Sequence, residues 1–425
     1  MKVSVIVIGD ELLIGQVTDT NSGRIARDLA PYGWEVSYVQ TVGDDAEEIT
    51  RAITRAFVLT DVVLTTGGLG PTKDDITKRV LCDYFGGTLE IDPSVTANIE
   101  RLFARRGLKL NELTAAQALV PTSCTVIQNF AGTAPVMWFE KDGKVLVSMP
   151  GVPFETASVF SPAVLPRLLA RFDSDVAIHH AVTIVTGYTE SALAMKIAAW
   201  EEALPPHLHL AYLPKPGLVR LRIDGRHSDA SFIRAEVDRA ASELHDILGD
   251  AVLASRDLTP AEILIEECRS RGLMVATAES CTGGNVAHEL TLIPGASDVV
   301  AGGIVSYSND VKTRVLSVSP DTLAAHGAVS IPVVRQMAEG ASRVTGAQLT
   351  VATSGIAGPG GGSDEKPVGT VCFCARLDLG DGHPREEYVT LHFNGDRARV
   401  IDTATTHALI IATRLLRFCN LGNFI

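Results

Sequence analysis

Three adjacent side chains with nucleophilic groups, Ser280, Cys281 and Thr282, occur in the segment AESCTGG. A buried strand is expected to end at Glu279 and a helix to begin near Thr282, which would place Ser280 and Cys281 at a helix N-terminus. Free backbone N–H groups at such a terminus can stabilise a developing oxyanion, and the two following glycines let a substrate approach the backbone closely. The segment therefore predicts a site for nucleophilic chemistry.

A serine nucleophile needs a base, and the best candidate is Lys312 in the segment SYSNDVKTRVL. Ser308 or Asn309 is expected to cap a helix that carries Lys312 in its first turn, where the helix dipole favours the neutral amine. A lysine with a pKa near 10.4 needs a fall of roughly three units to act as a base at neutral pH, so burial must supply most of that fall. Tyr307, at the end of the preceding strand, could relay a proton or hold the leaving group.

Cys281 is the alternative nucleophile. A helix N-terminus lowers the pKa of a thiol, and Glu279, Cys281 and Lys312 could form an amidase-like trio. On an extended chain the side chains of residues 279 and 281 point to one side and that of residue 280 to the other. Either Ser280 or Cys281 therefore faces the site, but not both. The spacing alone leaves the choice between serine and cysteine open. Thr282 is expected to act as a cap or a hydrogen-bond donor.

A long glycine-rich loop, TSGIAGPGGGSDEKPVGT, follows another predicted strand at residues 353–370. Its many backbone N–H groups favour a loop that binds a substrate phosphate or closes over a site. The alternative is a disordered surface loop without a function of its own.

A second group of candidate residues, GGLGPTKDDIT, follows the predicted strand at 61–66. Its glycine spacing matches neither a dinucleotide fingerprint nor a Walker loop, but its backbone N–H groups could line a phosphate. Asp74 and Asp75 could hold Mg²⁺ or a similar cation against a diphosphate, with Glu11 on the opposite strand end. A plain tight turn, followed by acidic residues in the first turn of a helix, is an equal alternative.

Three segments are expected to position these residues. Residues 1–171 alternate strands and helices, which predicts a parallel sheet with helices on both faces and ligands at the carboxyl ends of its strands. Residues 172–256 read as strand–helix–strand–strand–helix, a small α+β unit. Residues 257–425 start a second α/β domain. The predicted fold is therefore two α/β domains with parallel or mixed sheets, joined by a small α+β domain.

The composition limits the classes of function. A chain of 425 residues exceeds one ordinary hydrophobic core, which predicts two or three domains. Hydrophobic residues make up 46% and charged residues 20%, which is typical of an α/β enzyme and not of a disordered chain. The formal net charge of −13 argues against a nucleic-acid partner, because phosphate binding draws on clusters of Lys and Arg.

The cysteines and the apolar segments indicate a compartment. The seven cysteines are scattered, and their odd number favours free thiols in a reducing environment. The N-terminal segment MKVSVIVIGDE is too short in apolar residues for a signal peptide, and no segment approaches the roughly eighteen unbroken apolar residues of a membrane span. We therefore expect a cytoplasmic protein with no membrane partner.

These motifs resemble a known family. AESCTGG, GGIVSYSNDVK, GAVS, TSGIAGPGGG, KPVGTV and FNGDR are similar to the nicotinamide mononucleotide amidohydrolase domain of the CinA (competence/damage-inducible) proteins. GDELLIGQVTDTNS, GGLGPTKDDIT, NELTAAQALVP, GTAP and MPGVPFE resemble the N-terminal domain of that family, which is similar to molybdopterin-binding proteins. GYTESAL and LAYLPKPGLVRLRI resemble its small KH-like domain, although no G-x-x-G loop is present, which argues against RNA binding.

The resemblance implies two hydrolytic activities. The C-terminal domain would convert nicotinamide mononucleotide to nicotinate mononucleotide and ammonia without a cofactor. The N-terminal domain would hydrolyse ADP-ribose to AMP and ribose 5-phosphate with a divalent metal such as Mg²⁺, Mn²⁺ or Co²⁺. The resemblance also implies a homodimer whose partners are small nucleotides.

The resemblance implies roles for particular residues by motif position. Ser280 would be the nucleophile, Lys312 its base, Tyr307 a supporting residue and Cys281 a packed neighbour. The implied substrate contacts are Thr282, Gly283, Gly284, Gly358, Gly360, Gly361 and Arg397 in the C-terminal domain, and Gly67, Gly68, Gly70 and Thr72 in the N-terminal domain. The implied metal ligands are Glu11, Asp74 and Asp75.

Two alternatives to this function stay open. The N-terminal domain could bind a nucleotide or a pterin without turnover, beside an active deamidase. The whole protein could instead be a non-enzymatic partner in DNA uptake or repair, although nothing in the residues demands that reading.

Overall fold

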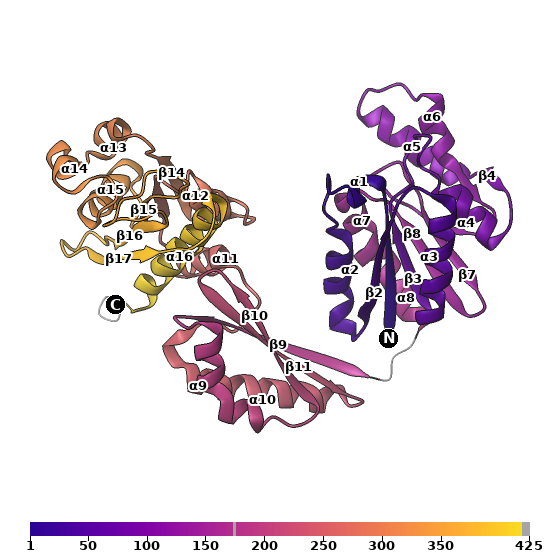
Figure 1. Cartoon of the computed structure of the whole chain (residues 1–425), viewed down its shortest axis with the longest axis horizontal. Coiled ribbons are helices and arrows are strands. Elements are labelled where there is room, and N and C mark those ends of the chain that lie inside the picture. Colours follow the sequence, from indigo (N-terminus) through magenta and orange to yellow (C-terminus); the bar gives the residue numbers. More distant parts are fainter. Residues whose placement is uncertain (173–175, 419–425) are drawn as a thin grey trace. The chain divides into compact units, whose positions relative to one another are not determined.

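The structure is a computed structural model that describes residues 1–172 and 176–418 (Figure 1). The described chain separates into two compact units, one formed by residues 1–180 with 225–236 and the other by the remaining residues. Among the described helices, none combines the length and the apolar character needed to cross a membrane.

A six-stranded mixed sheet with the order β2-β1-β3-β8-β7-β6 forms the centre of the N-terminal unit. Strands β1, β2 and β3 are parallel, as the alternation of strands and helices predicted, β8 runs parallel to β3, and β7 and β6 are antiparallel to their neighbours. The predicted α/β class is therefore confirmed, with a mixed sheet. The strands are β1 (Lys2–Ile8), β2 (Glu35–Val42), β3 (Val62–Thr66), β6 (Thr125–Ile127), β7 (Val136–Lys141) and β8 (Lys144–Met149), and a separate pair is formed by β4 (Leu89–Ile91) and β5 (Leu119–Pro121).

Helices cover both faces of this sheet (Figure 1). Val3, Val5 and Val7 of β1 pack with α2, α7 and α8, whereas Ile6 and Ile8 pack with α3 and α4. Both faces are buried, which explains why β1 reads as an unbroken apolar run. The helices are α1 (Asp10–Leu13), α2 (Asn21–Leu29), α3 (Ala46–Leu59), α4 (Thr77–Phe85), α5 (Pro93–Arg105), α6 (Glu112–Ala115), α7 (Pro153–Val159) and α8 (Leu165–Arg171), with short turns η1 (Ala30–Tyr32), η2 (Ala116–Ala118) and η3 (Phe160–Val164).

The middle segment forms a four-stranded sheet with the order β10-β11-β9-β12. Its elements follow the predicted order of strand, helix, strand, strand and helix, and the short strand β12 is an addition. They are β9 (Ala177–Thr186), α9 (Glu190–Glu202), β10 (Leu208–Lys215), β11 (Leu218–His227), α10 (Ala230–Leu248), η4 (Gly249–Ala251) and β12 (Val252–Ala254).

The C-terminal sheet has the order β14-β13-β15-β16-β17. Its strand β13 is parallel to both neighbours, and β16 and β17 are antiparallel to theirs. The carboxyl ends of β13, β14 and β15 therefore lie at one edge of the sheet. The strands are β13 (Val275–Glu279), β14 (Val300–Val305), β15 (Leu349–Gly355), β16 (Thr370–Leu377) and β17 (Arg385–His392).

Two layers of helices cover this second sheet. Val275, Val351 and Phe373 pack with α11, α12 and α16 on one face, and Ala278 and Cys374 pack with α13 and α15 on the other. The helices are α11 (Pro260–Arg271), α12 (Asn285–Thr291), α13 (Asn309–Leu316), α14 (Pro320–His326), α15 (Ile331–Thr345) and α16 (Arg397–Phe418), with the turn η5 (Ala296–Asp298).

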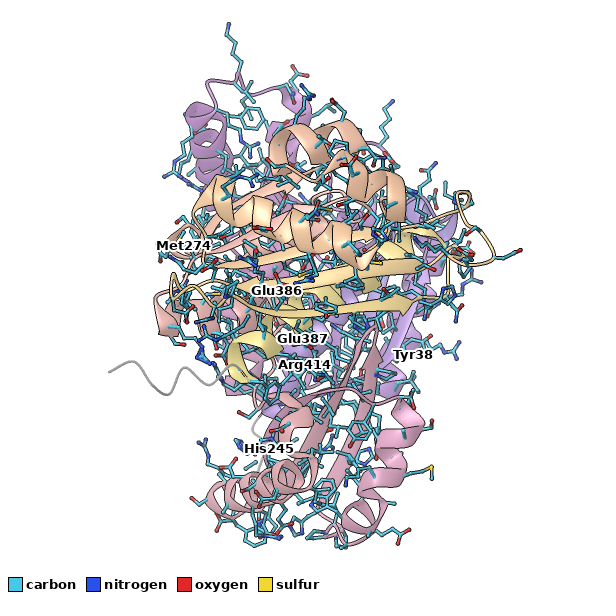
Figure 2. All side chains as sticks on the ribbon, turned by 90° about the vertical axis from the view of Figure 1, so that its left-hand side faces the viewer. Tyr38, His245, Met274, Glu386, Glu387 and Arg414 are labelled. Atoms are coloured by element: carbon cyan, nitrogen blue, oxygen red, sulfur yellow. The ribbon has the colours of Figure 1, made fainter. Side chains whose placement is uncertain are left out.

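Charged side chains hold the edge strand β17 in place. Glu386 accepts hydrogen bonds from Arg376 of β16 and from Arg335 of α15, both at 2.7 Å. Glu386, Glu387 and Arg414 of α16 are labelled in Figure 2, and Arg414 lies 3.8 Å from Glu387. These charges interrupt the apolar pattern of β17, which explains why the sequence did not predict this strand.

The cysteines of the described chain are free thiols, which confirms that prediction for Cys82, Cys124, Cys268, Cys281, Cys372 and Cys374. Cys419, the seventh cysteine of the sequence, lies outside the described residues.

Gly340 of α15 allows α13 to approach closely. A Cβ at this position would lie 2.1 Å from the carbonyl oxygen of Leu316, the last residue of α13, and a backbone atom cannot rotate away. We predict that Gly340→Ala lowers the free energy of unfolding by about 1–3 kcal/mol, although alanine is the better helix former by about 1 kcal/mol. Labelling of the buried Cys374 across a urea series, read by mass spectrometry, measures this change.

Gly23→Ala is the matched control, since Gly23 lies in α2 and a Cβ there would meet nothing within 4 Å. Labelling of the buried Cys82 should show an unchanged or slightly higher urea midpoint for this variant. Equal midpoints for wild type and Gly340→Ala would contradict the close approach of α13 and α15.

Candidate functional site

A cavity of about 300 Å³ lies where the parallel strands of the C-terminal sheet end. Ser280 follows β13, Tyr307 follows β14, and Lys312 projects from α13. The glycine-rich loop after β15 and Arg397 at the start of α16 complete the lining. The topology thus brings to one place the nucleophile, the base and the loop that the sequence singled out.

Lys312 and Ser280 are in direct contact. The Nζ of Lys312 lies 3.0 Å from the Oγ of Ser280, and it donates hydrogen bonds to the carbonyl oxygens of Ser306, at 2.7 Å, and Tyr307, at 3.3 Å. Lys312 is 1% exposed and Ser280 is 8% exposed. The predicted cap is also present, since the Oγ of Ser308 accepts a hydrogen bond from the N–H of Val311 at 3.2 Å. This cap fixes the first turn of α13 and the lysine on it.

The surroundings of Lys312 favour its neutral form. Burial lowers the pKa of the Lys312 amine from its ordinary value of 10.5, and the neighbouring Cys281 thiol opposes this effect. Within residues 1–172 and 176–418, no carboxylate forms an ion pair with this amine. A neutral amine has two N–H donors and one lone pair, which matches two carbonyl oxygens and one serine hydroxyl. In this state Ser280 donates its proton toward Lys312.

Cys281 lies in a different environment from Ser280, although it also borders the cavity. It is 6% exposed and packs in the core beneath α12 and α16. Burial is the main cause that raises the pKa of its thiol to about 12, so little thiolate exists at neutral pH. The geometry favours serine over cysteine as the nucleophile, a choice that the spacing in the sequence left open.

Glu279 connects β13 to α12. Its carboxylate is 1% exposed and accepts hydrogen bonds from the hydroxyls of Thr277, at 3.0 Å, and Thr282, at 2.7 Å. Three further donors are backbone N–H groups at the start of α12, those of Gly284, Val286 and Ala287, at 2.8–3.0 Å. Glu279 is therefore a structural anchor of the loop that carries Ser280 and not the third member of a catalytic trio.

One expectation from the sequence is wrong. The helix does not begin near Thr282, because α12 starts at Asn285, and its first N–H groups are used by Glu279. The N–H of Ser280 is also engaged, by the carbonyl oxygen of Thr353 at 2.9 Å. The side chain of Glu279 points toward α12 and accepts hydrogen bonds from N–H groups at the start of that helix, so these groups are not free. The helix N-terminus is therefore not an oxyanion site.

Arg397 and Tyr307 form one wall of the cavity. The guanidinium of Arg397 donates to the carbonyl oxygen of Gly358 at 2.7 Å and to the hydroxyl of Tyr307 at 2.9 Å. Tyr307 is 61% exposed, so its ring stands at the mouth of the cavity. Gly358, Gly360 and Gly361 line the same cavity, as the sequence analysis expected of the loop.

Three predicted substrate contacts, Thr282, Gly283 and Gly284, are not among the residues that line the cavity. The Thr282 hydroxyl is buried between Glu279 and the hydroxyl of Thr353, which lies 2.7 Å away. Ala328 and Val329 also line the cavity without a role predicted from the sequence, and so does Asn309, which was expected only as a possible helix cap; Ser354 lines it as part of the glycine-rich loop. Val329 and Ala328 belong to the quoted motif GAVS, which was the one signal available for them.

The N-terminal unit has its own cavity of about 400 Å³ at the carboxyl ends of its strands. The predicted residues Gly67, Gly68, Gly70, Glu11, Asp74 and Asp75 all line it. Gly67 has φ +109°, and a Cβ there would lie 2.0 Å from the carbonyl oxygen of Ile8, so only glycine fits. Asp44 and Glu155 add two carboxylates that the sequence analysis did not select, although Glu155 lies in the quoted motif MPGVPFE.

The carboxylates at this cavity differ in the hydrogen bonds that they accept. Asp75 accepts hydrogen bonds from the N–H groups of Gly70, at 2.7 Å, and Thr72, at 2.9 Å, and from the Thr72 hydroxyl. Thr72 does not line this cavity. Asp74 and Asp75 precede α4, which begins at Thr77, so they are loop residues and not the first turn of a helix.

Negative charge accumulates around Asp44. Burial, followed by the charges of Asp10, Glu11 and Asp75, raises the pKa of the Asp44 carboxyl, although the N–H of Asp10 opposes this. In the described part of the chain, no group of three or more His, Cys, Asp or Glu side chains forms a ready metal site.

Two family models match the chain. The one described as "CinA C-terminal domain" matches residues 257–416, and the one described as "Probable molybdopterin binding domain" matches residues 4–170. The folds and cavities therefore belong to a protein that joins a molybdopterin-binding type of domain to a CinA type of domain.

Relatives match along nearly the whole chain. A CinA-like protein from Cytophaga hutchinsonii is 42% identical over 86% of this chain and 88% of its own length. A CinA-like protein from Flavobacterium psychrophilum is 37% identical, with coverage of 96% and 97%. The crystal structure of the competence/damage inducible protein CihA from Agrobacterium tumefaciens is 41% identical and covers 37% of this chain and 93% of that chain, with a TM-score of 0.35. The chain belongs to the CinA family.

We predict that Glu279→Gln destabilises the C-terminal unit by about 2 kcal/mol or more, since hydrogen bonds to a charged group contribute about 1.5–3 kcal/mol each. The amide nitrogen of glutamine cannot accept from the N–H groups of α12. The loop that buries Cys281 should loosen, so Cys281 should react faster with a thiol reagent under native conditions. Glu289→Gln, which changes a carboxylate within α12, is the control. An unchanged labelling rate in Glu279→Gln would show that the carboxylate does not anchor the loop.

Proposed function

We propose that the C-terminal cavity hydrolyses the carboxamide of nicotinamide mononucleotide, which yields nicotinate mononucleotide and ammonia. The observation that carries this proposal is the buried Lys312 amine, 3.0 Å from the Ser280 hydroxyl and held by two carbonyl oxygens. A serine paired with a neutral lysine is suited to acyl transfer, because the amine removes the hydroxyl proton as the oxygen attacks.

The first half of the reaction forms an acyl-enzyme. The Oγ of Ser280 attacks the carboxamide carbon and its proton moves to the Nζ of Lys312. The resulting ammonium then donates that proton to the leaving nitrogen as the C–N bond breaks, so ammonia departs. Gly358, Gly360 and Gly361 line the cavity, and backbone N–H groups of their loop are the donors proposed for the oxyanion.

The second half of the reaction releases the acid. A water molecule gives a proton to the neutral Nζ of Lys312 as its oxygen attacks the ester carbon. The ester bond to the Oγ of Ser280 then breaks, and the lysine returns the proton to the serine. Water is consumed, ammonia and the carboxylic acid are formed, and the enzyme regains its starting state.

Arg397 is the residue proposed to hold the phosphate of this substrate. A guanidinium has five N–H donors. Arg397 donates one hydrogen bond to Gly358 and one to Tyr307, so further N–H groups remain for a phosphate oxygen. Its contact with Tyr307 would keep both side chains at the mouth of the cavity. Tyr307 would then act as a positioning residue.

We predict that Ser280→Ala abolishes ammonia release from nicotinamide mononucleotide, whereas Cys281→Ala retains most of it. The serine variant removes the nucleophile, which costs at least about a thousandfold in kcat in comparable sites. The cysteine variant removes only a buried packing group. A coupled ammonia assay measures both. If the cysteine variant is the inactive one, the thiol is the nucleophile and the assignment to serine is wrong.

The pH dependence follows from Lys312. Since burial lowers its pKa and the base must be neutral, kcat/KM should be low where the amine is protonated and should rise with pH through a value below 10.5. Lys312→Arg keeps a positive charge at every accessible pH and should lack both activity and the rising limb. A pH profile in which Lys312→Arg retains the wild-type limb would exclude Lys312 as the base.

A second function is proposed for the N-terminal cavity, the hydrolysis of ADP-ribose to AMP and ribose 5-phosphate. It is supported by a cavity of about 400 Å³ in which a glycine-rich loop meets the carboxylates of Glu11, Asp44 and Asp74. Glu11, Asp44 and Asp74 line this cavity, and one or two of their carboxylates would hold a divalent cation that polarises the diphosphate of the substrate. The glycine loop would bind the phosphate oxygens through its backbone.

We predict that the wild type releases AMP from ADP-ribose when Mg²⁺, Mn²⁺ or Co²⁺ is added, and that a chelator stops this release. Glu11→Gln should lower kcat by about tenfold or more through weaker cation binding, whereas Glu47→Gln, on the exposed face of α3, should not change it. Binding of ADP-ribose without AMP release would instead support a non-catalytic nucleotide- or pterin-binding domain. A salt-sensitive gel shift with DNA, together with no ammonia release, would support the non-enzymatic alternative.

A further inference from the structure

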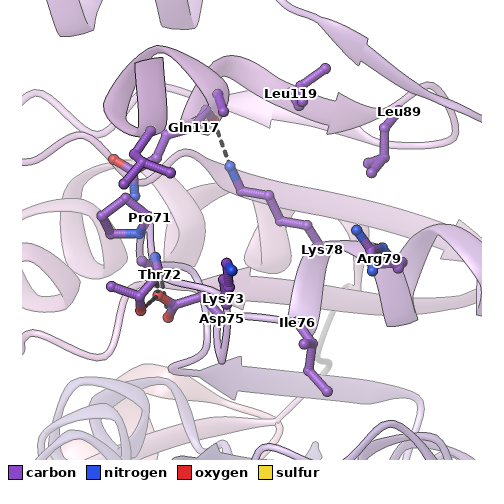
Figure 3. A pocket seen from close by; sticks show the side chains of 13 residues that line it. Pro71, Thr72, Lys73, Asp75, Ile76, Lys78, Arg79, Leu89, Gln117 and Leu119 are labelled. Carbon is purple, nitrogen blue, oxygen red and sulfur yellow. Dashed lines mark hydrogen bonds between the residues drawn. The ribbon is translucent and has the colours of Figure 1, made fainter. Parts of the chain in front are cut away.

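A second cavity of the N-terminal unit, of about 450 Å³, lies beside the one described above. Figure 3 shows the side chains that line it. Gly70, Pro71, Asp75 and Gln117 line both cavities, so the loop before α4 is a wall that the two cavities share. The second cavity has no role in the reactions proposed above.

The charge of this cavity is opposite to that of its neighbour. Lys73, Lys78 and Arg79 line it, and the one carboxylate in the lining is Asp75. Asp75 already accepts hydrogen bonds from the N–H groups of Gly70 and Thr72. The chain has a formal net charge of −13, whereas the lining of this cavity is mainly cationic, which indicates an anionic ligand.

Lys78 is the most enclosed of the three cations. Its Nζ donates one hydrogen bond, to the carbonyl oxygen of Gln117, as Figure 3 shows. The Gln117 side chain is 4% exposed and its Nε2 donates to the carbonyl oxygen of Leu69 at 3.0 Å, which ties this support to the glycine loop. No carboxylate pairs with Lys78 anywhere in the described residues. An ammonium has three donors, so two remain for a ligand.

Part of the lining is apolar. Leu89 of β4, Leu113 of α6 and Leu119 of β5 contribute their side chains to the cavity. A volume of about 450 Å³ falls within the range of sites for small molecules of nucleotide size. The cavity therefore combines a cationic region for a phosphate with an apolar region for a ring.

We propose that this cavity binds a nucleoside monophosphate, with its phosphate on Lys78, Lys73 and Arg79 and its base against the three leucines. The choice of this ligand rests on the proposed hydrolysis of ADP-ribose, since AMP is a product of that reaction and would be formed across the shared wall. Occupation of the cavity by AMP would make it a product-binding site that slows further turnover.

The protonation of Lys78 agrees with this role. Burial lowers the pKa of the Lys78 amine to about 8, and the charges of Asp75 and Cys124 oppose that shift. Lys73 and Arg79 are the other charged groups that face the cavity. Lys78 is therefore an ammonium at pH 7, and AMP should bind more weakly as the pH rises above 8.

The test is isothermal titration of the full chain with AMP at pH 7 in the absence of divalent metal. Lys78→Gln should weaken binding by about ten- to a hundredfold, because a charge-assisted hydrogen bond is lost. Lys78→Arg should keep most of the affinity, which ties binding to the positive charge at this position. Lys2→Gln, an exposed lysine of the same unit, is the matched control and should bind like the wild type.

Three ligands distinguish the parts of the cavity. Adenosine and ribose 5-phosphate should each bind more weakly than AMP, since one lacks the phosphate and the other lacks the base. Equal affinity of the wild type and Lys78→Gln for AMP would overturn the proposal. If AMP binding depends on Lys78 but ADP-ribose is not hydrolysed, this site is supported and the proposed N-terminal activity is rejected. If ADP-ribose is hydrolysed but AMP binding does not depend on Lys78, the activity is supported and this site is rejected.

Discussion

The burial of the Lys312 amine without a carboxylate partner is the constraint on which the C-terminal site depends. An ammonium in this position would lose its hydration and would gain only two carbonyl oxygens and a hydroxyl. The neutral amine has the two donors and the lone pair that these groups require. The surroundings of Lys312 therefore favour the unprotonated amine beside a serine, which is the form that the proposed chemistry requires.

The rest of the C-terminal unit holds this pair in place. The Ser308 cap fixes the first turn of α13, and Gly340 lets α15 pack against the end of the same helix. On the other side, the Glu279 carboxylate fixes the loop of Ser280 against α12. Two independent anchors thus set the 3.0 Å separation between Lys312 and Ser280. The Glu279 carboxylate beside Ser280 thus anchors the loop through its hydrogen bonds to α12.

The sequence predicted those features that depend on local pattern. The apolar runs of β1 and β13, the cap at Ser308 and the meeting of loops at the carboxyl ends of parallel strands follow from periodicity and topology. The start of α12 was not predictable, because Glu279 supplies its cap from within the preceding strand. The cationic cavity around Lys78 also escaped notice, since its residues come from α4, α6 and two short strands that only the tertiary fold brings together.

The central claim is that burial lowers the pKa of the Lys312 amine and so makes it available as a base. NMR of protein labelled with ¹³C at the ε-carbon of lysine follows the protonation of each amine, and Lys312→Arg identifies the resonance. The account predicts that this resonance titrates with a midpoint below the ordinary value of 10.5. It also predicts that the midpoint changes when Ser280, the hydroxyl in contact with the amine, is replaced by alanine. A Lys312 resonance that stays that of an ammonium up to the ordinary value would contradict the role of this lysine as the base.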